Sequence, residues 1–328
     1  MPASDVVVIG GGQAGLAAAY YLRRAGLSYV VLDAQPIPGG AWPHGWNSLR
    51  LFSIARHSSL PGWPMPAFSD GYPTAQHVVD YLAAYEKRYD VPVRRPVVVT
   101  SVSRDGDELK VRTDSGDWSA RHVISATGTW WRPFRPLMEL PGRQLHTVDY
   151  RDPGEFAGQK VVVVGGGNSG AQIAADLLPH VSPTWMTRRP PRYLPDEIDG
   201  KALFDIASRR AGGVGELGDI VAVPPVRQAR DSGLLTATPM DADVLARADV
   251  VIWASGFRPA LGHLSPLRLR DERGRIAVEG TTAIGEPRMH LLGYGGWTGA
   301  ASATLIGVGP TAKATVARID AELAARPR

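Results

Sequence analysis

Residues 5–33 read DVVVIGGGQAGLAAAYYLRRAGLSYVVLD and contain the pattern that decides the fold. A run of β-branched residues is followed by a glycine turn, an alanine-rich helical segment and a second apolar run, which is the order of a βαβ unit. Residues 160–189, KVVVVGGGNSGAQIAADLLPHVSPTWMTRR, repeat this order. The apolar runs are continuous rather than alternating, as is typical of parallel strands covered on both faces. The sequence therefore predicts an α/β fold with two Rossmann-like dinucleotide-binding domains.

The first glycine turn has the spacing of a dinucleotide-binding motif. Gly10 permits the tight turn, Gly12 lets the backbone approach a pyrophosphate, and Gly15 lets the helix pack close to the strand. The helix N-terminus offers free N–H groups and a positive dipole end to phosphates. Asp33 ends the second predicted strand, where a carboxylate can accept hydrogen bonds from both ribose hydroxyls of an adenosine. The alternative is a glycine turn in another doubly wound fold.

The second glycine turn has the same motif, but the residues that follow its second strand are different. Its motif is formed by Gly165, Gly167 and Gly170, and Asn168 and Ser169 are additional polar candidates for contact with a dinucleotide. No carboxylate occupies the position that matches the acid of the first unit.

Two guanidinium groups, Arg188 and Arg189, follow the second strand of this unit instead. An acid there would repel a 2′-phosphate, whereas arginine binds phosphate bidentately. The pair therefore predicts NADPH rather than NADH, the alternative being solvated surface charges.

Two dinucleotide sites with different ribose chemistry favour FAD on the first and NADPH on the second, because a nicotinamide can pass hydride to an isoalloxazine. We expect an FAD-binding domain of residues 1–155 plus 260–328, with an NADPH-binding domain of residues 156–259 inserted into it.

Further cofactor contacts are expected at Gln13, Ala14, Ala34, Gly40, Trp42, Val99, Thr127, Gly128 and Gly256. The glycine-rich stretch 293–299 is expected to return to the flavin, and helices are expected over 74–89, 199–211 and 310–325.

Composition excludes several other kinds of site. The 328 residues include no cysteine, which rules out disulfides, cysteine-bound zinc, iron–sulfur clusters and dithiol redox centres. The net charge of +4 comes without a long basic run, so we expect no nucleic-acid partner. No apolar stretch approaches about 18 residues and no signal peptide is evident, so we expect a cytoplasmic protein without a membrane span. None of the eight histidines has metal-ligand spacing, and no metal is expected.

Four further segments carry recognisable motifs. In residues 140–150, Gly142, His146 and Tyr150 fit the pattern Phe-x-Gly-x-x-x-His-x-x-x-aromatic, from which Leu140 departs. Ala-Thr-Gly and Ala-Ser-Gly follow at 126–128 and 254–256, and Gly-Gly-Ala-Trp lies at 39–42. With the two glycine turns, these segments resemble the class B flavin-containing monooxygenases. The stretches 46–53 and 56–62 are most similar to small flavin monooxygenases encoded in bacterial arsenic-resistance operons.

This resemblance implies that NADPH reduces FAD, and that reduced flavin reacts with O2 to form a C4a-peroxyflavin. That species would oxygenate a small substrate at a soft heteroatom or carbonyl group, arsenicals being one candidate. An aromatic-rich loop would keep water away, with Trp42, Trp46, Phe52 and Trp63 as its members. The resemblance leaves the assembly open, with a homodimer as one option.

One departure concerns catalysis. Many class B monooxygenases carry an Asn-Thr pair that here falls on Phe52 and Ser53. Phenylalanine cannot donate the hydrogen bonds of an asparagine, so Arg50 and Ser53 are the candidate catalytic replacements.

Two rival functions remain open. One is an NADPH-dependent flavoprotein reductase that passes electrons to a quinone or a redox protein, although the thioredoxin-reductase type is excluded because it needs a cysteine pair. The other is a sensor that binds NADPH without catalysis.

Overall fold

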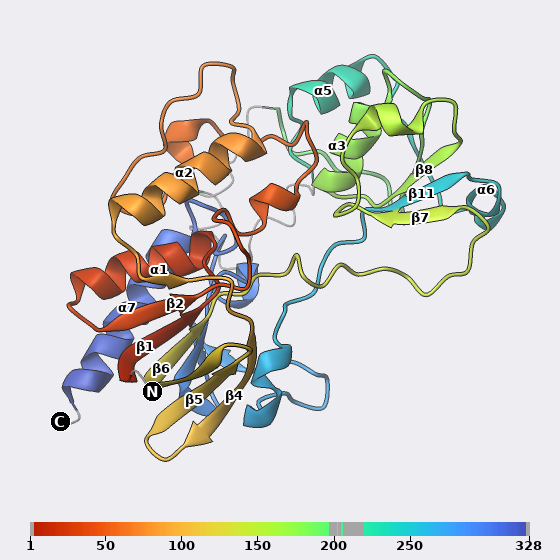
Figure 1. The fold of residues 1–328 in the computed structure, drawn as a ribbon. Helices are drawn as coiled ribbons and strands as arrows, with labels where there is room; N and C mark the ends of the chain where they lie inside the picture. The colour runs from red at the N-terminus through yellow and green to blue at the C-terminus, as the bar shows by residue number, and fades with distance from the viewer. Residues whose placement is uncertain (1–2, 197–201, 203–204, 206–219, 326–328) are drawn as a thin grey trace.

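The computed structural model describes residues 3–196, 202, 205 and 220–325. The chain forms two α/β halves, each built on its own sheet (Figure 1). Of the helix expected over 199–211, all but residues 202 and 205 lie outside the described residues.

The first sheet has nine strands. Its parallel part runs in the order β3 (Val93–Arg94), β2 (Tyr29–Leu32), β1 (Ala3–Ile9), β6 (Gly116–Ser125) and β14 (Glu286–Leu291). Beyond β14 the sheet continues with antiparallel β13 (Thr282–Ala283) and β12 (Val278–Glu279). The first half of β6 also pairs with β5 (Glu108–Thr113), which pairs in turn with β4 (Val99–Asp105). The carboxyl ends of β1, β2, β6 and β14 therefore meet at one edge of the sheet.

Three helices cover one face of this sheet: α1 (Gln13–Arg24), α2 (Ala75–Arg88) and α7 (Val308–Ala324). Side chains alternate along β1, so that Val6 and Val8 join the core under these helices, while Val7 and Ile9 join the core on the opposite face. Both faces of β1 are thus buried, as its continuous apolar run predicts.

The second sheet is wholly parallel, in the order β10 (Ala237–Thr238), β9 (Thr184–Met186), β8 (Val161–Val164), β11 (Val250–Trp253) and β7 (Arg143–His146). Its helices are α3 (Asn168–Leu177), α5 (Pro224–Asp231) and α6 (Ala242–Ala246). Short 3-10 turns complete the described elements: η1 (Trp42–His44), η2 (Ala55–His57), η3 (Pro153–Phe156), η4 (Gly262–Leu267) and η5 (Gly295–Trp297). None of the described helices is long and apolar enough to cross a membrane.

The second sheet takes one strand from outside the expected range 156–259. Strand β7, residues 143–146, pairs with β11 along its whole length. Its sequence, RQLH, has no β-branched residue and only one aliphatic side chain, so apolar patterning does not reveal it. We propose that the division between the halves lies before residue 143, and the domain limits stay a proposal.

The two connections between the halves are hydrogen-bonded to each other. The chain leaves the first sheet after β6 and returns to it before β14, and Figure 1 shows both crossings. Phe134 N–H bonds to Gly256 O at 2.9 Å, and Arg258 N–H bonds to Arg132 O at 2.9 Å. The crossings, residues 128–134 and 254–260, thus form a short antiparallel pair.

Candidate cofactor sites

The two glycine turns are equivalent in their closest contacts. Gly10 has a φ of +107°, and a Cβ built there would lie 2.5 Å from the carbonyl oxygen of Ala126. Gly165 has a φ of +147°, and its Cβ would lie 2.3 Å from the carbonyl oxygen of Ala254. Only glycine fits either position. Each turn is therefore held against the linker that follows a neighbouring parallel strand.

The last glycine of each motif lies against the first. A Cβ on Gly15 would meet the carbonyl oxygen of Gly10 at 1.9 Å, and one on Gly170 would meet that of Gly165 at 2.0 Å. The helices α1 and α3 consequently start in contact with their strands, as the spacing predicts.

The middle glycines leave open space in front of the helix N-termini. The nearest atom to a Cβ on Gly12 would be the Cα of Gly40 at 3.4 Å, and a Cβ on Gly167 would meet nothing within 4 Å. Neither helix has a side-chain cap. Uncapped N–H groups facing open space suit a phosphate.

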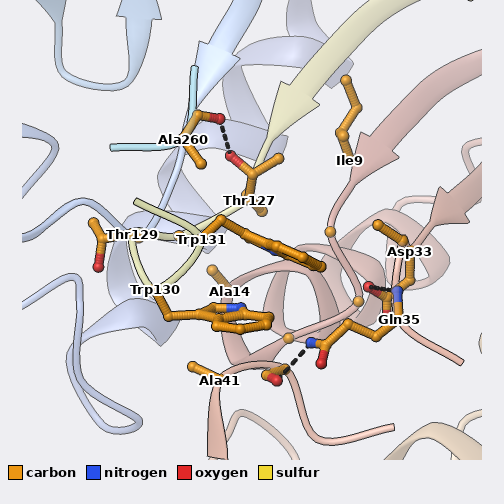
Figure 2. Close-up of a pocket in the computed structure, with 18 of the residues that line it drawn as sticks. Ile9, Ala14, Asp33, Gln35, Ala41, Thr127, Thr129, Trp130, Trp131 and Ala260 are labelled. Carbon is orange, nitrogen blue, oxygen red and sulfur yellow. Dashed lines mark hydrogen bonds between the residues drawn. The ribbon is translucent and has the colours of Figure 1, made fainter. Parts of the chain in front are cut away.

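A cavity of about 520 Å³ opens beside the first turn (Figure 2). Residues expected to contact a cofactor line it as follows: Gly10, Gly12, Gln13, Ala14, Asp33, Ala34, Gly40, Trp42, Val99, Thr127 and Gly128. Gly293, Tyr294 and Gly295 also line it, so the glycine-rich stretch before α7 returns to this cavity as expected. Gly15 is not in the lining, in keeping with its packing role.

The acid at the end of β2 is held by a buried cation. Arg95 donates from Nη2 to Asp33 Oδ2 at 3.0 Å, and from Nη1 to Glu86 Oε1 at 2.7 Å. The Asp33 side chain is 6% exposed and that of Arg95 is 12% exposed. The other carboxylate oxygen of Asp33 accepts only a 3.4 Å bond from the N–H of Gln35. Oδ1 is thus the Asp33 oxygen with the weaker hydrogen bond to the described part of the protein.

Aromatic rings close another side of the cavity. The indoles of Trp130 and Trp131 lie 4.1 Å apart between centroids, and Figure 2 shows both in the lining. The His44 ring stacks on Trp130, with 3.7 Å between the ring centroids. The Gln35 side-chain amide donates to Gly40 O, so its oxygen Oε1 is the acceptor for His44 Nε2 at 2.6 Å. Burial, and the nearby positive charge of Arg151, lower the pKa of His44, which keeps the ring neutral. Trp131 is 49% exposed, so these rings form a partly solvent-exposed side of the cavity.

A buried hydroxyl network lies along the lining at the ends of β6 and β14. The Tyr294 hydroxyl is 3.0 Å from Ser125 Oγ and 2.9 Å from Thr127 Oγ1, and it accepts from the Thr127 N–H at 3.3 Å. Thr127 Oγ1 donates to Ala260 O at 2.8 Å, and His263 Nε2 is 3.1 Å from Ser125 Oγ. Burial lowers the pKa of His263 to about 4. Thr127 therefore ties the cavity to the returning linker.

The second site differs from the first in the residues that follow its second strand, where the ribose is expected. In each unit the first glycine donates its N–H to the last strand residue, Leu32 at 2.8 Å in one and Met186 at 2.9 Å in the other. Thr187 therefore matches Asp33 and places a neutral hydroxyl where the first unit has a carboxylate. The side chains of Arg188 and Arg189 come next, both exposed, and neither forms an ion pair within the described residues.

Three other expected contacts have structural partners. Asn168 Oδ1 accepts from the N–H of Val221 at 2.8 Å, so this side chain anchors the segment before α5. Ser169 is partly buried in the first turn of α3. Gly256 lies in the returning linker, where its carbonyl accepts a 3.0 Å bond from His146 Nε2. His146 is therefore a link between linker and sheet, as expected from its motif.

Neither candidate catalytic residue lies at the first cavity. Arg50 donates to Asp70 Oδ2 at 2.9 Å and lines a different cavity. Ser53 is buried and hydrogen-bonded to Ser58 at 2.8 Å. Phe52 packs against the core of the second half. Their catalytic roles stay predictions. Within the described residues, no group of three His, Asp or Glu side chains could hold a metal ion.

Comparison with known proteins decides the family. Residues 7–283 match the pyridine nucleotide-disulphide oxidoreductases. The chain belongs to this family. Lacking cysteine, this oxidoreductase has no thiol pair for disulfide chemistry.

Two relatives are similar over nearly the whole chain. The flavin-containing monooxygenase from Stenotrophomonas maltophilia is 48% identical, with a TM-score of 0.91 over 98% of this chain and 100% of that one. The uncharacterised CzcO-like oxidoreductase of Geobacillus kaustophilus is 30% identical over 94% of this chain and 96% of its own. The resemblance to flavin monooxygenases, and with it an oxidoreductase activity, is confirmed.

A more distant neighbour shares the fold. OTEMO, solved in complex with FAD and NADP, has a TM-score of 0.70 at 17% identity, over 99% of this chain and 85% of that one.

Proposed function

We propose that this chain is an FAD-dependent, NADPH-driven monooxygenase that oxygenates a small substrate at a soft heteroatom or carbonyl group. The observation that carries the proposal is the pair of equivalent glycine turns with unlike ribose edges. The first ends in Asp33, and the second ends in Thr187 with Arg188 and Arg189 beyond it.

The residues of the first cavity fit an FAD. Gly12 and the uncapped start of α1 leave room for the pyrophosphate, and a side chain larger than glycine at Gly40 would meet Gly12 Cα at 2.8 Å. Asp33 is held in place to accept a ribose hydroxyl. When bound, the flavin supplies hydride acceptance and the reaction with O2.

The second site fits NADPH. Gly167 faces open space at the start of α3, and Thr187 introduces no negative charge beside a 2′-phosphate. Arg188 and Arg189 are solvent-exposed and have no ion-pair partner among the residues described. Guanidinium groups in this state are suited to grip a phosphate.

The protein's own contribution is binding, orientation and exclusion of water. Trp130, Trp131 and Tyr294 line the first cavity with aromatic surface. No protein nucleophile is required, because the cofactor carries the reactive chemistry. The substrate is proposed only as a class, within which arsenicals remain one candidate.

The decisive experiment follows flavin absorbance in the purified chain. We expect a yellow protein that NADPH bleaches without oxygen, and faster than an equal concentration of NADH does. Under air with a thioether or ketone substrate, oxygen uptake should yield oxygenated product. Complete recovery of the electrons as hydrogen peroxide, or as reduced quinone, would instead support the reductase alternative. A colourless protein without affinity for FAD would overturn both.

A further inference from the structure

A second cavity of about 650 Å³ lies between the two halves, and the proposed function does not use it. We name it the junction cavity. The first half supplies residues from the loop before α2, and the second half supplies α3 and the start of α5. Its lining consists of Trp46, Asn47, Ser48, Arg50, Ile54, Asp70, Gly71, Tyr72, Thr74, Gln172, Asp176, Val223, Pro224, Pro225 and Val226.

The junction cavity is separate from the cavity beside the first glycine turn, because the two share no described lining residue. Gln172 and Asp176 lie one and two turns after Asn168 on the same face of α3, which is about 6 Å and about 12 Å along the helix axis. The part of α3 that lines the junction cavity is thus remote from the helix N-terminus that faces a phosphate.

The one cation among the described lining residues already forms an ion pair. Arg50 pairs with the Asp70 carboxylate at 2.9 Å. It also donates to the carbonyl oxygens of Asp70 and Tyr72, each at 3.0 Å. A ligand anion would therefore compete with a protein carboxylate for this guanidinium.

The other carboxylate is not matched by a cation. Asp176 accepts a 2.6 Å hydrogen bond from the Tyr150 hydroxyl and forms no ion pair with any described residue. Asp176 is the last residue but one of α3, where the helix dipole adds partial negative charge. The described lining residues thus carry a net negative charge, concentrated at Asp176.

Another part of the lining is apolar. Trp46, at 7% exposure, and Val226, fully buried, line the cavity together with Pro224 and Pro225 in the first turn of α5. The two prolines have no N–H, so this helix start offers little to an anion. A carboxylate and apolar side chains in one cavity suit a ligand with a positive head and a hydrocarbon body.

We propose that the junction cavity binds a small amphipathic amine, with its ammonium at Asp176 and its apolar body against Trp46 and the start of α5. The volume lies within the range of small-molecule sites. Because Trp46 belongs to the first half, and Asp176 and α5 belong to the second, such a ligand contacts both halves at once and favours the arrangement in which they are close.

The test measures binding of n-hexylammonium to the purified full-length chain, with saturating FAD and NADP⁺ and without NADPH, so that no turnover occurs. Titration calorimetry should show one site. Hexan-1-ol, which has the same body without the charge, should bind at least tenfold more weakly. Asp176→Asn should also weaken amine binding at least tenfold. Asp231→Asn, which neutralises an exposed carboxylate at the other end of α5, should leave it unchanged.

A second variant guards against misfolding of the first. Gln172→Glu adds a carboxylate one turn earlier on the same face of α3 and should tighten amine binding severalfold. Equal affinity of the amine for Asp176→Asn and the unaltered chain would overturn the proposal. So would binding that appears only when NADP⁺ is left out, which would place the amine at the dinucleotide site. Because the readout is heat of binding, an absence of flavin chemistry would not affect the result.

Discussion

The Arg95 guanidinium lies 3.0 Å from the Asp33 carboxylate and 2.7 Å from that of Glu86, and so joins the end of β2 to α2. The backbone of the first glycine turn lies against this pair, since a Cβ on Gly11 would be 2.7 Å from Asp33 Oδ2. A fixed carboxylate loses less freedom on binding a ribose than a mobile one. We therefore expect Arg95 to position Asp33 for the adenosine end of FAD.

The first prediction concerns this ion pair. Arg95→Met should leave Asp33 buried without its cation, and FAD affinity should fall about tenfold, or about 1.4 kcal/mol. The KM for NADPH should change little, because the second turn is untouched. Flavin titration by fluorescence quenching measures the first effect, and steady-state kinetics at saturating FAD measure the second. Arg94→Gln, which alters an exposed neighbour, is the control. Unchanged FAD affinity in Arg95→Met would contradict the assignment.

The second prediction concerns the choice of nicotinamide cofactor. Replacing Arg188 and Arg189 by alanine should raise the KM for NADPH at least tenfold and leave that for NADH nearly constant. Thr187→Asp should act in the same direction, because a carboxylate there repels a 2′-phosphate and accepts bonds from a ribose. Kinetics with both cofactors compare the variants. Equal effects on NADPH and NADH would exclude recognition of the 2′-phosphate.

The third prediction separates packing from cofactor approach in the second turn. Gly170→Ala places a methyl group 2.0 Å from the backbone of Gly165 and should lower the melting temperature strongly. Gly167→Ala meets no atom within 4 Å, so the melting temperature should hold while the KM for NADPH rises. Thermal denaturation and kinetics of both proteins test the pair. A reversed pattern would show that the roles are assigned to the wrong glycines.

The fourth prediction concerns acid stability. Burial lowers the pKa of His290 to about 3 and that of His263 to about 4, from an ordinary value of 6.5. Below pH 6.5 these two histidines take up protons in the unfolded chain but stay neutral in the folded chain. The free energy of unfolding therefore falls as pH decreases from 6.5 toward 3. Above 6.5 both rings are neutral in either state and contribute no slope. His290→Gln should flatten the dependence of melting temperature on pH in this window. An unaltered slope would contradict the prediction.

The glycine turns and their strands could be predicted from the sequence because local chemistry determines them. Gly10 and Gly165 must be glycine because another backbone segment lies against each of them. Gly15 and Gly170 must be glycine because they lie against Gly10 and Gly165, so the spacing of the motif is visible in the sequence. Asp33 could likewise be predicted, because it directly follows the second strand of the first βαβ unit.

Contacts made across the fold could not be predicted in this way. Arg95 reaches Asp33 over 62 residues of sequence, and no spacing rule joins them. Trp130 stacks on His44 only because a linker crosses the loop that carries the histidine. Arg50 is expected near the flavin because of its place in the sequence. In the fold, its ion pair with Asp70 holds the side chain in the lining of the junction cavity instead.

The paired crossings between the halves have a mechanical consequence. Because residues 128–134 and 254–260 are joined by three backbone hydrogen bonds, including Ala260 N–H to Gly128 O at 3.0 Å, they behave as one ribbon rather than two tethers. A ribbon twists about its long axis more readily than it slides or stretches. We therefore expect relative motion of the halves to be mainly a swivelling of one half against the other.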